Sequence, residues 1–394
     1  MSYSNEIIQE IKQRNNILNI VSRYAILQQS GDEWFCNCPL HREKTPSFVI
    51  SNSKQTYYCY GCGKSGDVIT FLMDYTKHSF SEVIEELAYE SNMSLAGPIE
   101  DDYDFLLKKE RLLQINKDAA SYYFYTLRSN DGTIGYKYFQ ERGLDESTMQ
   151  RFGLGYSLGS NQTLLNFLRK KGYSDIEIKE AGLINIDETF GPYDKFTNRV
   201  MFPIQDVRGK VIGFGGRVMG DAKPKYLNSP ETMIFDKSRN LYGLNIASTS
   251  QKDNIIMCEG YMDVISVHQA GFNQAVASLG TSLTPGQADL LSKYTKNILL
   301  MYDSDEPGVK ASIRAIPILA RAGLNIKVVS LAPYKDPDEF ILKLGVEEFQ
   351  KRLDSATPSL TFLSDLVKKR FDVNTMERKE ELFKTISEEI SATN

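Results

Sequence analysis

Ile255-Ile256-Met257-Cys258-Glu259 is a short apolar run that ends in a carboxylate, and it opens a regular alternation in the chain. Similar apolar runs follow it, separated by stretches whose apolar spacing is compatible with helices. These runs are Ala275-Val276-Ala277, Ile298-Leu299-Leu300-Met301-Tyr302 and Ile326-Lys327-Val328-Val329-Ser330-Leu331. Strands that alternate with helices are typical of a parallel sheet with crossover helices. We therefore predict an α/β domain for this part of the chain.

Acidic residues follow three of these predicted strands. Glu259 directly follows the first, Asp303-Ser304-Asp305 follows the third, and Asp336-Pro337-Asp338 follows the fourth after a short turn. In a parallel α/β sheet, ligands gather at the carboxyl ends of the strands. Carboxylates that converge there repel one another unless a divalent cation is present, and Mg²⁺ or Mn²⁺ takes hard oxygen ligands. Phosphoryl transfer needs such a cluster, although aspartates after strands also commonly cap helices or form turns.

Four cysteine and histidine residues nearer the N-terminus have the spacing of a zinc site. Cys38 and His41 are separated by two residues, as are Cys59 and Cys62, and 17 residues lie between the two pairs. Two close pairs on two turns can supply the tetrahedron of soft ligands that zinc requires. A site with four protein ligands is closed and structural, and its binding energy contributes to folding. Cys36 could replace Cys38, but the two-residue spacing to His41 favours Cys38.

The composition is that of an ordinary globular protein with more than one domain. The chain has 394 residues, 41% of them hydrophobic, and a net charge of −5, which favours two or three compact units. A nucleic-acid surface would therefore have to be a local basic patch. Five cysteines do not suggest a disulfide framework, and we expect a reducing cytoplasm. Neither a bilayer-spanning run nor a secretory signal pattern is expected.

The remaining sequence divides into helical and mixed regions. Apolar spacing predicts helices within residues 6–24, 67–73, 81–90 and 104–127, an acidic linker at 97–102, and amphipathic helices from about residue 340. Short aromatic and β-branched runs over 34–62 favour a small β ribbon around the cysteines. Cys258 is expected to be inert core, and His78 and His268 to lie on helix surfaces. Lys64-Ser65 does not complete a phosphate-binding loop, because Tyr58 stands where its first glycine should be.

A basic segment lies between residues 193 and 240, where nine Lys and Arg stand against five Asp and Glu. It contains Gly213-Phe214-Gly215-Gly216-Arg217 and Pro224-Lys225-Tyr226-Leu227-Asn228. Glycines permit close approach of backbone to phosphate, and an arginine can bind it through two N–H groups. Taken alone this is a weak indication, since glycine-rich hairpins with surface lysines are common.

Several segments together resemble bacterial DnaG-type primases. Cys38–Phe48 and Tyr58–Asp67 resemble the zinc-binding domain of that family, with Leu40 and Tyr60 where phenylalanine is more usual. Segments 138–144, 152–156 and 199–230 resemble the basic subdomain of its polymerase core. Residues 259–264, 277–281 and 303–308 resemble its Toprim fold, with Ser304 where glycine is usual.

The resemblance implies a multidomain α+β and α/β protein. Its expected parts are a zinc ribbon of β ribbon and flanking helices (1–96), a linker (97–105), a mixed α+β basic subdomain (106–248), a Toprim parallel-sheet domain (249–340) and C-terminal helices (341–394). It also implies one structural Zn²⁺ at Cys38, His41, Cys59 and Cys62, and catalytic Mg²⁺ or Mn²⁺ at Glu259, Asp303 and Asp305. The other carboxylates that it places at the catalytic site are Asp336, Asp338 and the supporting Asp263.

The activity implied by the resemblance is synthesis of RNA primers from ribonucleoside triphosphates on single-stranded DNA during replication. The residues that it assigns to template or nucleotide binding are Arg142, Arg217, Lys225, Tyr226, Asn228 and Lys237. In the ribbon, single-stranded DNA would be contacted by Tyr57, Tyr58 and Tyr60 together with Lys44, Lys54 and Lys64. The alternative is that the tyrosines only pack the ribbon and the lysines are only solvated.

Two other functions remain open from the sequence. One is a Toprim nuclease or strand-cleaving enzyme with a zinc-ribbon module, and the other is a DNA-binding adaptor with an inactive Toprim domain. The five intact carboxylates argue against the adaptor. Full-length relatives carry a C-terminal domain that docks on the replicative helicase. The chain stops at Asn394, inside the expected helices, so helicase binding through that domain is not expected of it.

Overall fold

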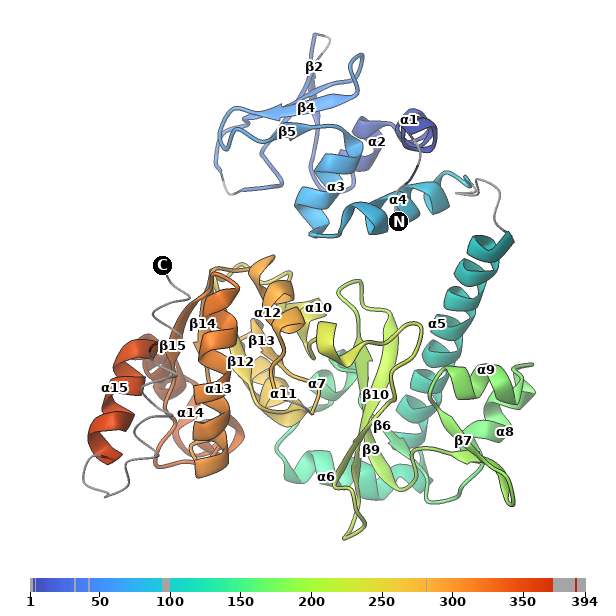
Figure 1. The fold of residues 1–394 in the computed structure, drawn as a ribbon, viewed down its shortest axis with the longest axis vertical. Helices are drawn as coiled ribbons and strands as arrows, with labels where there is room; N and C mark the ends of the chain where they lie inside the picture. Colours follow the sequence, from blue (N-terminus) through green and yellow to red (C-terminus); the bar gives the residue numbers. More distant parts are fainter. Residues whose placement is uncertain are drawn as a thin grey trace. The chain divides into compact units, whose positions relative to one another are not determined.

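The computed structural model describes residues 3, 5–31, 33–41, 43–93, 100–280, 282–370 and 387. The chain divides into two compact units, residues 1–107 and 108–394 (Figure 1). Within the described residues, no helix has both the length and the apolar character needed to cross a membrane. Thr281 and Arg42, which belong to segments quoted for the resemblance, lie outside the described residues, as does nearly all of 371–394.

The first unit is an antiparallel sheet packed against short helices. Its five strands, in spatial order, are β1 (Gln28–Ser30), β2 (Glu33–Cys36), β3 (Phe48–Ser51), β4 (Thr56–Cys59) and β5 (Ser65–Gly66). Its helices are α1 (Asn5–Arg14), α2 (Ile17–Val21), α3 (Val68–Thr76) and α4 (Phe80–Glu90). Alternate residues of β4 are buried, as expected of a strand with one face on a core. The ring of Tyr57 stacks on Phe48, with centroids 4.8 Å apart.

The second unit begins with helices around an antiparallel sheet. The strands, in spatial order, are β11 (Tyr226–Asn228), β10 (Val211–Val218), β9 (Arg199–Gln205) and β6 (Gly155–Ser157), and a separate hairpin pairs β7 (Ile184–Asp187) with β8 (Gly191–Asp194). The helices are α5 (Glu100–Leu127), α6 (Thr133–Glu141), α7 (Glu146–Arg151), α8 (Thr163–Lys170), α9 (Asp175–Glu180) and α10 (Leu244–Ala247), with short 3₁₀ turns η1 (Asn130–Gly132) and η2 (Lys237–Arg239). This is the predicted mixed α+β part.

The predicted parallel sheet forms the rest of this unit (yellow to red in Figure 1). Its order is β13 (Ala275–Ala277), β12 (Asn254–Cys258), β14 (Asn297–Leu300), β15 (Asn325–Val328) and β16 (Thr357–Pro358). The first four strands are parallel to one another, and β16 pairs antiparallel with β15. The connecting and following helices are α11 (Tyr261–Gln269), α12 (Pro285–Ser292), α13 (Glu306–Arg321), α14 (Pro337–Asp354) and α15 (Ser359–Arg370).

Both faces of strand β12 are buried, which explains its uninterrupted apolar sequence. Ile256 and Cys258 pack in one core cluster with residues of α11, whereas Ile255 and Met257 pack in another with residues of α12 and α13. The predicted burial of Cys258 is therefore confirmed. The predicted fold class is also confirmed, because a small ribbon, a mixed region and a largely parallel sheet follow one another along the chain.

Several local expectations differ from the structure. The helical region within 6–24 is interrupted, because the Asn16 side chain accepts a hydrogen bond from the Leu18 amide and starts α2. Residues 100–105 of the expected linker form the start of α5, whereas 97–99 lie outside the described residues. Strands β14 and β15 end at Leu300 and Val328, earlier than the apolar runs suggest.

The predicted surface position of both histidines is wrong. His78 lies between α3 and α4, its side chain is only 8% exposed, and Nδ1 is 3.4 Å from the Glu86 carboxylate. His268 is on the buried side of α11, with Nε2 2.8 Å from the carbonyl oxygen of Ala275. Neither residue has a local sequence pattern that marks burial, since each meets its partner through tertiary packing.

The buried His268 predicts a pH dependence of stability. Burial lowers the pKa of His268 to about 4, below the usual 6.5 of the unfolded chain. The unfolded state therefore binds the extra proton between pH 6.5 and 4, and stability falls as pH falls through that window. We expect the His268 contribution to drop by about 2 kcal/mol from pH 7 to pH 5. Urea unfolding should show a smaller pH slope for His268→Gln than for wild type; equal slopes would contradict this assignment.

Candidate metal centres and nucleic-acid surface

The first unit brings the four predicted zinc ligands together. Cys38 and His41 lie after β2, and Cys59 and Cys62 lie at the end of β4, with all four ligand atoms within 4.8 Å of one another. Cys36 belongs to β2, is buried, and is not part of this group. Two thiolates on one turn, with a third thiolate and an imidazole on the other strand end, are the donor set that zinc prefers. The residues present therefore fit a structural zinc ion.

A carboxylate that the sequence analysis did not identify supports this group. The Nδ1 atom of His41 is 3.8 Å from the Cys59 sulfur, and its Nε2 is 3.3 Å from Glu43 Oε2. Glu43 also accepts the backbone N–H of Cys38 at 2.6 Å and the Ser47 hydroxyl. Such a carboxylate orients a metal-binding imidazole and fixes its tautomer. An acidic residue two positions after a histidine is too common in sequences to have indicated this role.

At the acidic site, the sheet places Glu259 beside Asp303. Strands β12 and β14 are parallel neighbours, with Met257 opposite Leu300, so the residues that follow them leave the sheet at the same edge. The backbone N–H of Asp303 donates to Glu259 Oε2 at 3.3 Å. The segment Asp336-Pro337-Asp338 is joined to the same edge through the residue before it. The Ser304 N–H donates to the carbonyl oxygen of Lys335 at 2.9 Å.

The carboxylates at this edge repel one another. Burial, followed by the charges of Glu259 and Asp336, raises the pKa of Asp303 to about 6, and the nearby Lys335 offsets part of that rise. The Lys335 Nζ lies 3.2 Å from Asp305 Oδ2 and 3.7 Å from Asp303 Oδ2. An ammonium group therefore provides positive charge where the cluster requires it. Oxygen donors with an excess of negative charge fit a hard divalent cation.

The acidic site is more open than the zinc site. Within the described ranges, the Cys/His group is the only set of three or more Cys, His, Asp or Glu ligand atoms that lie close enough together to hold an ion. The carboxylate oxygens of Glu259, Asp303 and Asp305 are therefore spaced more widely than the zinc ligands. The capping alternative also proves correct for two aspartates: Asp305 accepts the Gly308 N–H at 3.0 Å and Asp336 the Glu339 N–H at 2.8 Å. For Asp305 one oxygen caps α13 while the other faces Lys335.

Asp263 borders the acidic site, whereas the side chain of Asp338 is turned to other partners. Asp263 is half-buried and its Oδ2 accepts the Gly260 N–H at 2.8 Å, and desolvation, followed by the charge of Asp303, raises its pKa well above the usual value. Asp338 Oδ2 is 3.1 Å from Arg142 NH1, and its Oδ1 accepts the Ser266 hydroxyl at 2.9 Å. Both oxygens of Asp338 are thus engaged away from Asp303.

Three of the predicted nucleic-acid residues gather near one buried tyrosine. The guanidinium groups of Arg217 and Arg142 lie 4.4 Å and 5.8 Å from the ring centroid of Tyr138. Burial raises the pKa of Tyr226 to about 12, and the charges of both arginines offset part of that rise. Tyr226 is 41% exposed. An aromatic group beside two guanidiniums is suited to hold a phosphate and stack on a base.

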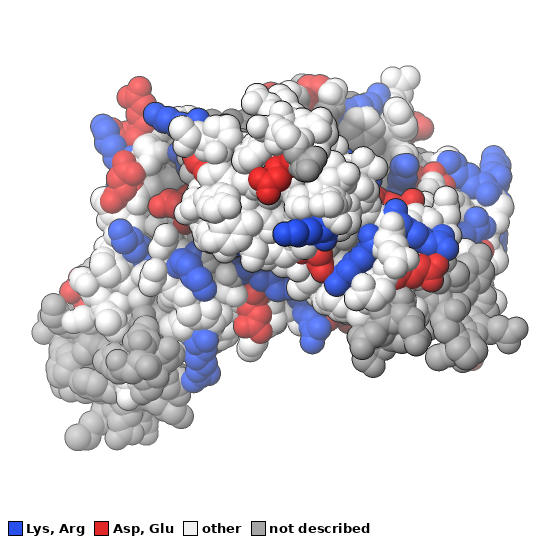
Figure 2. Space-filling view, turned by 90° about the horizontal axis from the view of Figure 1, so that it is seen from above, with Lys and Arg blue, Asp and Glu red and all other residues white. Residues whose placement is uncertain are grey.

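The other predicted basic-surface residues are less uniform. Lys225 is exposed before β11, and Lys237 lies in η2. Asn228 is used inside the protein, since it accepts the Tyr261 hydroxyl and donates to the Leu279 carbonyl oxygen, each at 2.8 Å. Figure 2 shows basic and acidic side chains interspersed on the face that it presents, in a protein whose net charge is −5.

In the ribbon, the three tyrosines have different roles. Tyr57 is 2% exposed and its hydroxyl donates to Asp74, which also pairs with Lys64 at 2.9 Å. Tyr57 and Lys64 are therefore committed to packing and an internal ion pair. Tyr58 and Tyr60 are 45% and 76% exposed, with ring centroids 4.8 Å apart.

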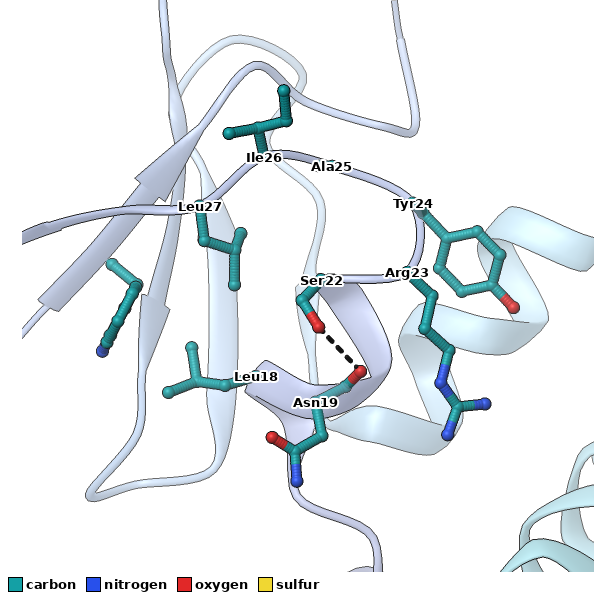
Figure 3. A pocket seen from close by; sticks show the side chains of 9 residues that line it. Leu18, Asn19, Ser22, Arg23, Tyr24, Ala25, Ile26 and Leu27 are labelled. Atoms are coloured by element: carbon teal, nitrogen blue, oxygen red, sulfur yellow. Dashed lines mark hydrogen bonds between the residues drawn. The ribbon is translucent and has the colours of Figure 1, made fainter.

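A hollow of about 750 Å³ lies beside α2 of the first unit (Figure 3). Leu18, Leu27 and Trp34 line it, together with Arg23, whose guanidinium pairs with Glu90 at 2.6 Å. Ile26 stands at its edge and is 89% exposed. No residue predicted for a functional site lines this hollow.

Comparison with known proteins adds independent findings. The chain matches a CHC2 zinc finger model over residues 3–101, a model of the N-terminal domain of the DNA primase catalytic core over 122–248, and a Toprim-like model over 256–341. A DNA primase of Clostridium acetobutylicum is 46% identical over 363 residues, which are 91% of this chain and 60% of that protein. The chain thus spans about three fifths of that relative's length.

Solved structures resemble the chain over most of its length. The zinc-binding and RNA polymerase domains of the Aquifex aeolicus primase match with 34% identity and a TM-score of 0.63, covering 98% of this chain and 92% of that one. A DnaG primase catalytic domain bound to single-stranded DNA matches with 35% identity and a TM-score of 0.64, covering 73% and 94%.

The zinc group predicts a stoichiometry that distinguishes its cysteines. Cys59→Ser is expected to abolish the binding of one zinc ion and to destabilise the ribbon, because a closed site loses its tetrahedron. Cys36→Ala is the matched control, since it removes a buried cysteine outside the group. Metal analysis and thermal melts would measure both effects. Loss of zinc from Cys36→Ala would contradict the four-residue group and show that Cys36 is a ligand.

Proposed function

The chain belongs to the DnaG-type primase family, and we propose from this that it is a DNA primase that makes short RNA primers on single-stranded DNA. In class it would be a nucleotidyltransferase, a DNA-directed RNA polymerase that uses ribonucleoside triphosphates. The single observation that carries the proposal is the 3.3 Å contact between Glu259 and the Asp303 amide. It places the carboxylates that follow two neighbouring strands at one edge of the sheet.

We propose that Glu259, Asp303 and Asp305 hold Mg²⁺ or Mn²⁺, with Asp336 beside them. When bound, these ions would orient the attacking oxygen and neutralise charge on the triphosphate. The bond formed would join the 3′-hydroxyl oxygen of one ribonucleotide to the α-phosphorus of the next, and pyrophosphate would leave. Lys335, held beside Asp303 and Asp305, supplies positive charge at the same edge. Asp263 supports the turn after β12 through the Gly260 amide.

We assign template and nucleotide contacts to the basic surface. Arg142, Arg217 and Tyr226 would bind phosphate and stack on bases, and Lys225 and Lys237 would add charge. Asn228 would act by holding β11 against the loop at Leu279. In the ribbon, the exposed pair Tyr58 and Tyr60 is the proposed stacking surface, with Lys44 and Lys54 for phosphates. The ribbon would help to select the start site.

The proposed partition into domains follows the zinc ribbon (1–96), the linker (97–105), the basic subdomain (106–248), the Toprim domain (249–340) and the helical segment (341–394). The family-model matches over 3–101, 122–248 and 256–341 support this order. Chromosome replication in bacteria takes place in the cytoplasm, where we place the protein.

Ribonucleotide incorporation tests the proposal directly. Asp303→Asn is expected to lower incorporation on single-stranded DNA roughly a hundredfold or more. The neutral amide lacks the negative charge that holds the divalent cation, and the cation stabilises the transition state. Asp289→Asn, at an exposed position of α12, is the matched control and should retain activity.

The assay would use labelled ribonucleoside triphosphates with Mg²⁺ or Mn²⁺. Wild-type activity retained in Asp303→Asn would contradict the proposed site. Nicking of DNA without synthesis would support the strand-cleaving alternative, and DNA binding without either reaction would support the adaptor.

A further inference from the structure

Asp338 stands two residues after Asp336, yet the two side chains face different parts of the protein. Asp336 caps α14, and its charge acts on Asp303. Asp338 contacts Arg142 and Ser266 instead. Asp336 is the N-cap residue and has extended backbone, whereas Asp338 lies in the first turn of α14, so the backbone sends the two side chains in different directions. The start of α14 therefore directs one carboxylate to the acidic site and the next one away from it.

The surroundings of Asp338 explain why its position is well defined. Its side chain is 16% exposed, and each oxygen has a partner from a different element. Ser266 belongs to α11, against which α14 packs. Arg142 is the C-terminal cap residue of α6, and its backbone N–H donates to the Tyr138 carbonyl oxygen at 3.1 Å. The ion pair thus connects the basic subdomain to the Toprim sheet.

Arg142 needs an anion at this place. Its guanidinium shares the Tyr138 ring with that of Arg217, and two like charges this close repel one another. Asp338 compensates one of them. The pair uses NH1 of Arg142, and 40% of the arginine side chain stays exposed. A guanidinium has five N–H donors, so donors remain for a phosphate oxygen.

We propose that Asp338 is a positioning residue that acts through Arg142 and does not belong to the divalent-cation site. It orients the Arg142 guanidinium beside Tyr138 and Arg217, at the surface where template or triphosphate phosphates bind. The proposal rests on the proposed primase function for its catalytic readout. It changes the assignment that sequence order suggests, in which Asp336 and Asp338 act as one pair.

The test compares Asp338→Asn with Asp303→Asn in two measurements. Calorimetry with Mn²⁺ should give Asp338→Asn an affinity within about twofold of wild type, whereas Asp303→Asn should lose most of its binding. Ribonucleotide incorporation by Asp338→Asn should fall roughly tenfold, because a displaced guanidinium no longer meets its phosphate. Binding of a labelled single-stranded oligonucleotide should fall less than incorporation does, since the variant also removes a negative charge near the strand and thereby offsets part of a lost contact.

The double variant shows through which residue Asp338 acts. Adding Asp338→Asn to Arg142→Gln should cause no further loss of incorporation, because the partner is already absent. Arg142→Lys keeps the charge but not the planar group, and its own loss of incorporation measures how far the geometry of the guanidinium matters. Thermal melts identify any variant that fails to fold.

Two results would overturn the proposal. One is a loss of Mn²⁺ affinity in Asp338→Asn as large as that in Asp303→Asn, and the other is additive losses in the double variant. If wild type binds Mn²⁺ but incorporates no ribonucleotide, the proposed function fails. The Mn²⁺ comparison then still decides whether Asp338 belongs to the cation site.

Discussion

Repulsion between the carboxylates that follow β12 and β14 is the constraint on which the acidic site depends. The parallel pairing of these strands brings Glu259 to the Asp303 amide, and burial together with neighbouring charges raises the pKa of Asp303. A fold that only needed stability would not collect anions at one edge, because each must be compensated. Lys335 and the helix starts at Asp305 and Asp336 provide part of that compensation. The remainder fits a cation brought from outside.

The two candidate metal centres follow different physical rules. The Cys/His group is compact, with four ligands within 4.8 Å and a carboxylate, Glu43, that orients His41. Such a site is saturated by the protein and suits a structural ion. The acidic site has more widely spaced oxygen donors. The first centre would therefore add to the stability that the hydrophobic core gives the ribbon, and the second would take part in chemistry.

Local patterns predicted most of the architecture. Alternating apolar runs predicted the parallel sheet, because both faces of β12 are buried, and the spacing of two residue pairs indicated the zinc group. Tertiary contacts account for what was missed. The burial of His268 depends on Ala275 of a neighbouring strand. The internal position of the Asn228 side chain depends on its hydrogen bonds with Tyr261 and Leu279. The orientation of Asp338 depends on Arg142, 196 residues away in the sequence. No local pattern encodes such partners.

The most direct test of the account is the location of a divalent cation in the protein. Anomalous diffraction from crystals soaked in Mn²⁺ would show it without reference to activity. The account predicts a peak at coordination distance from the carboxylates of both Glu259 and Asp303. A saturated crystal with no peak there, or with its peak at Asp338 instead, would contradict it.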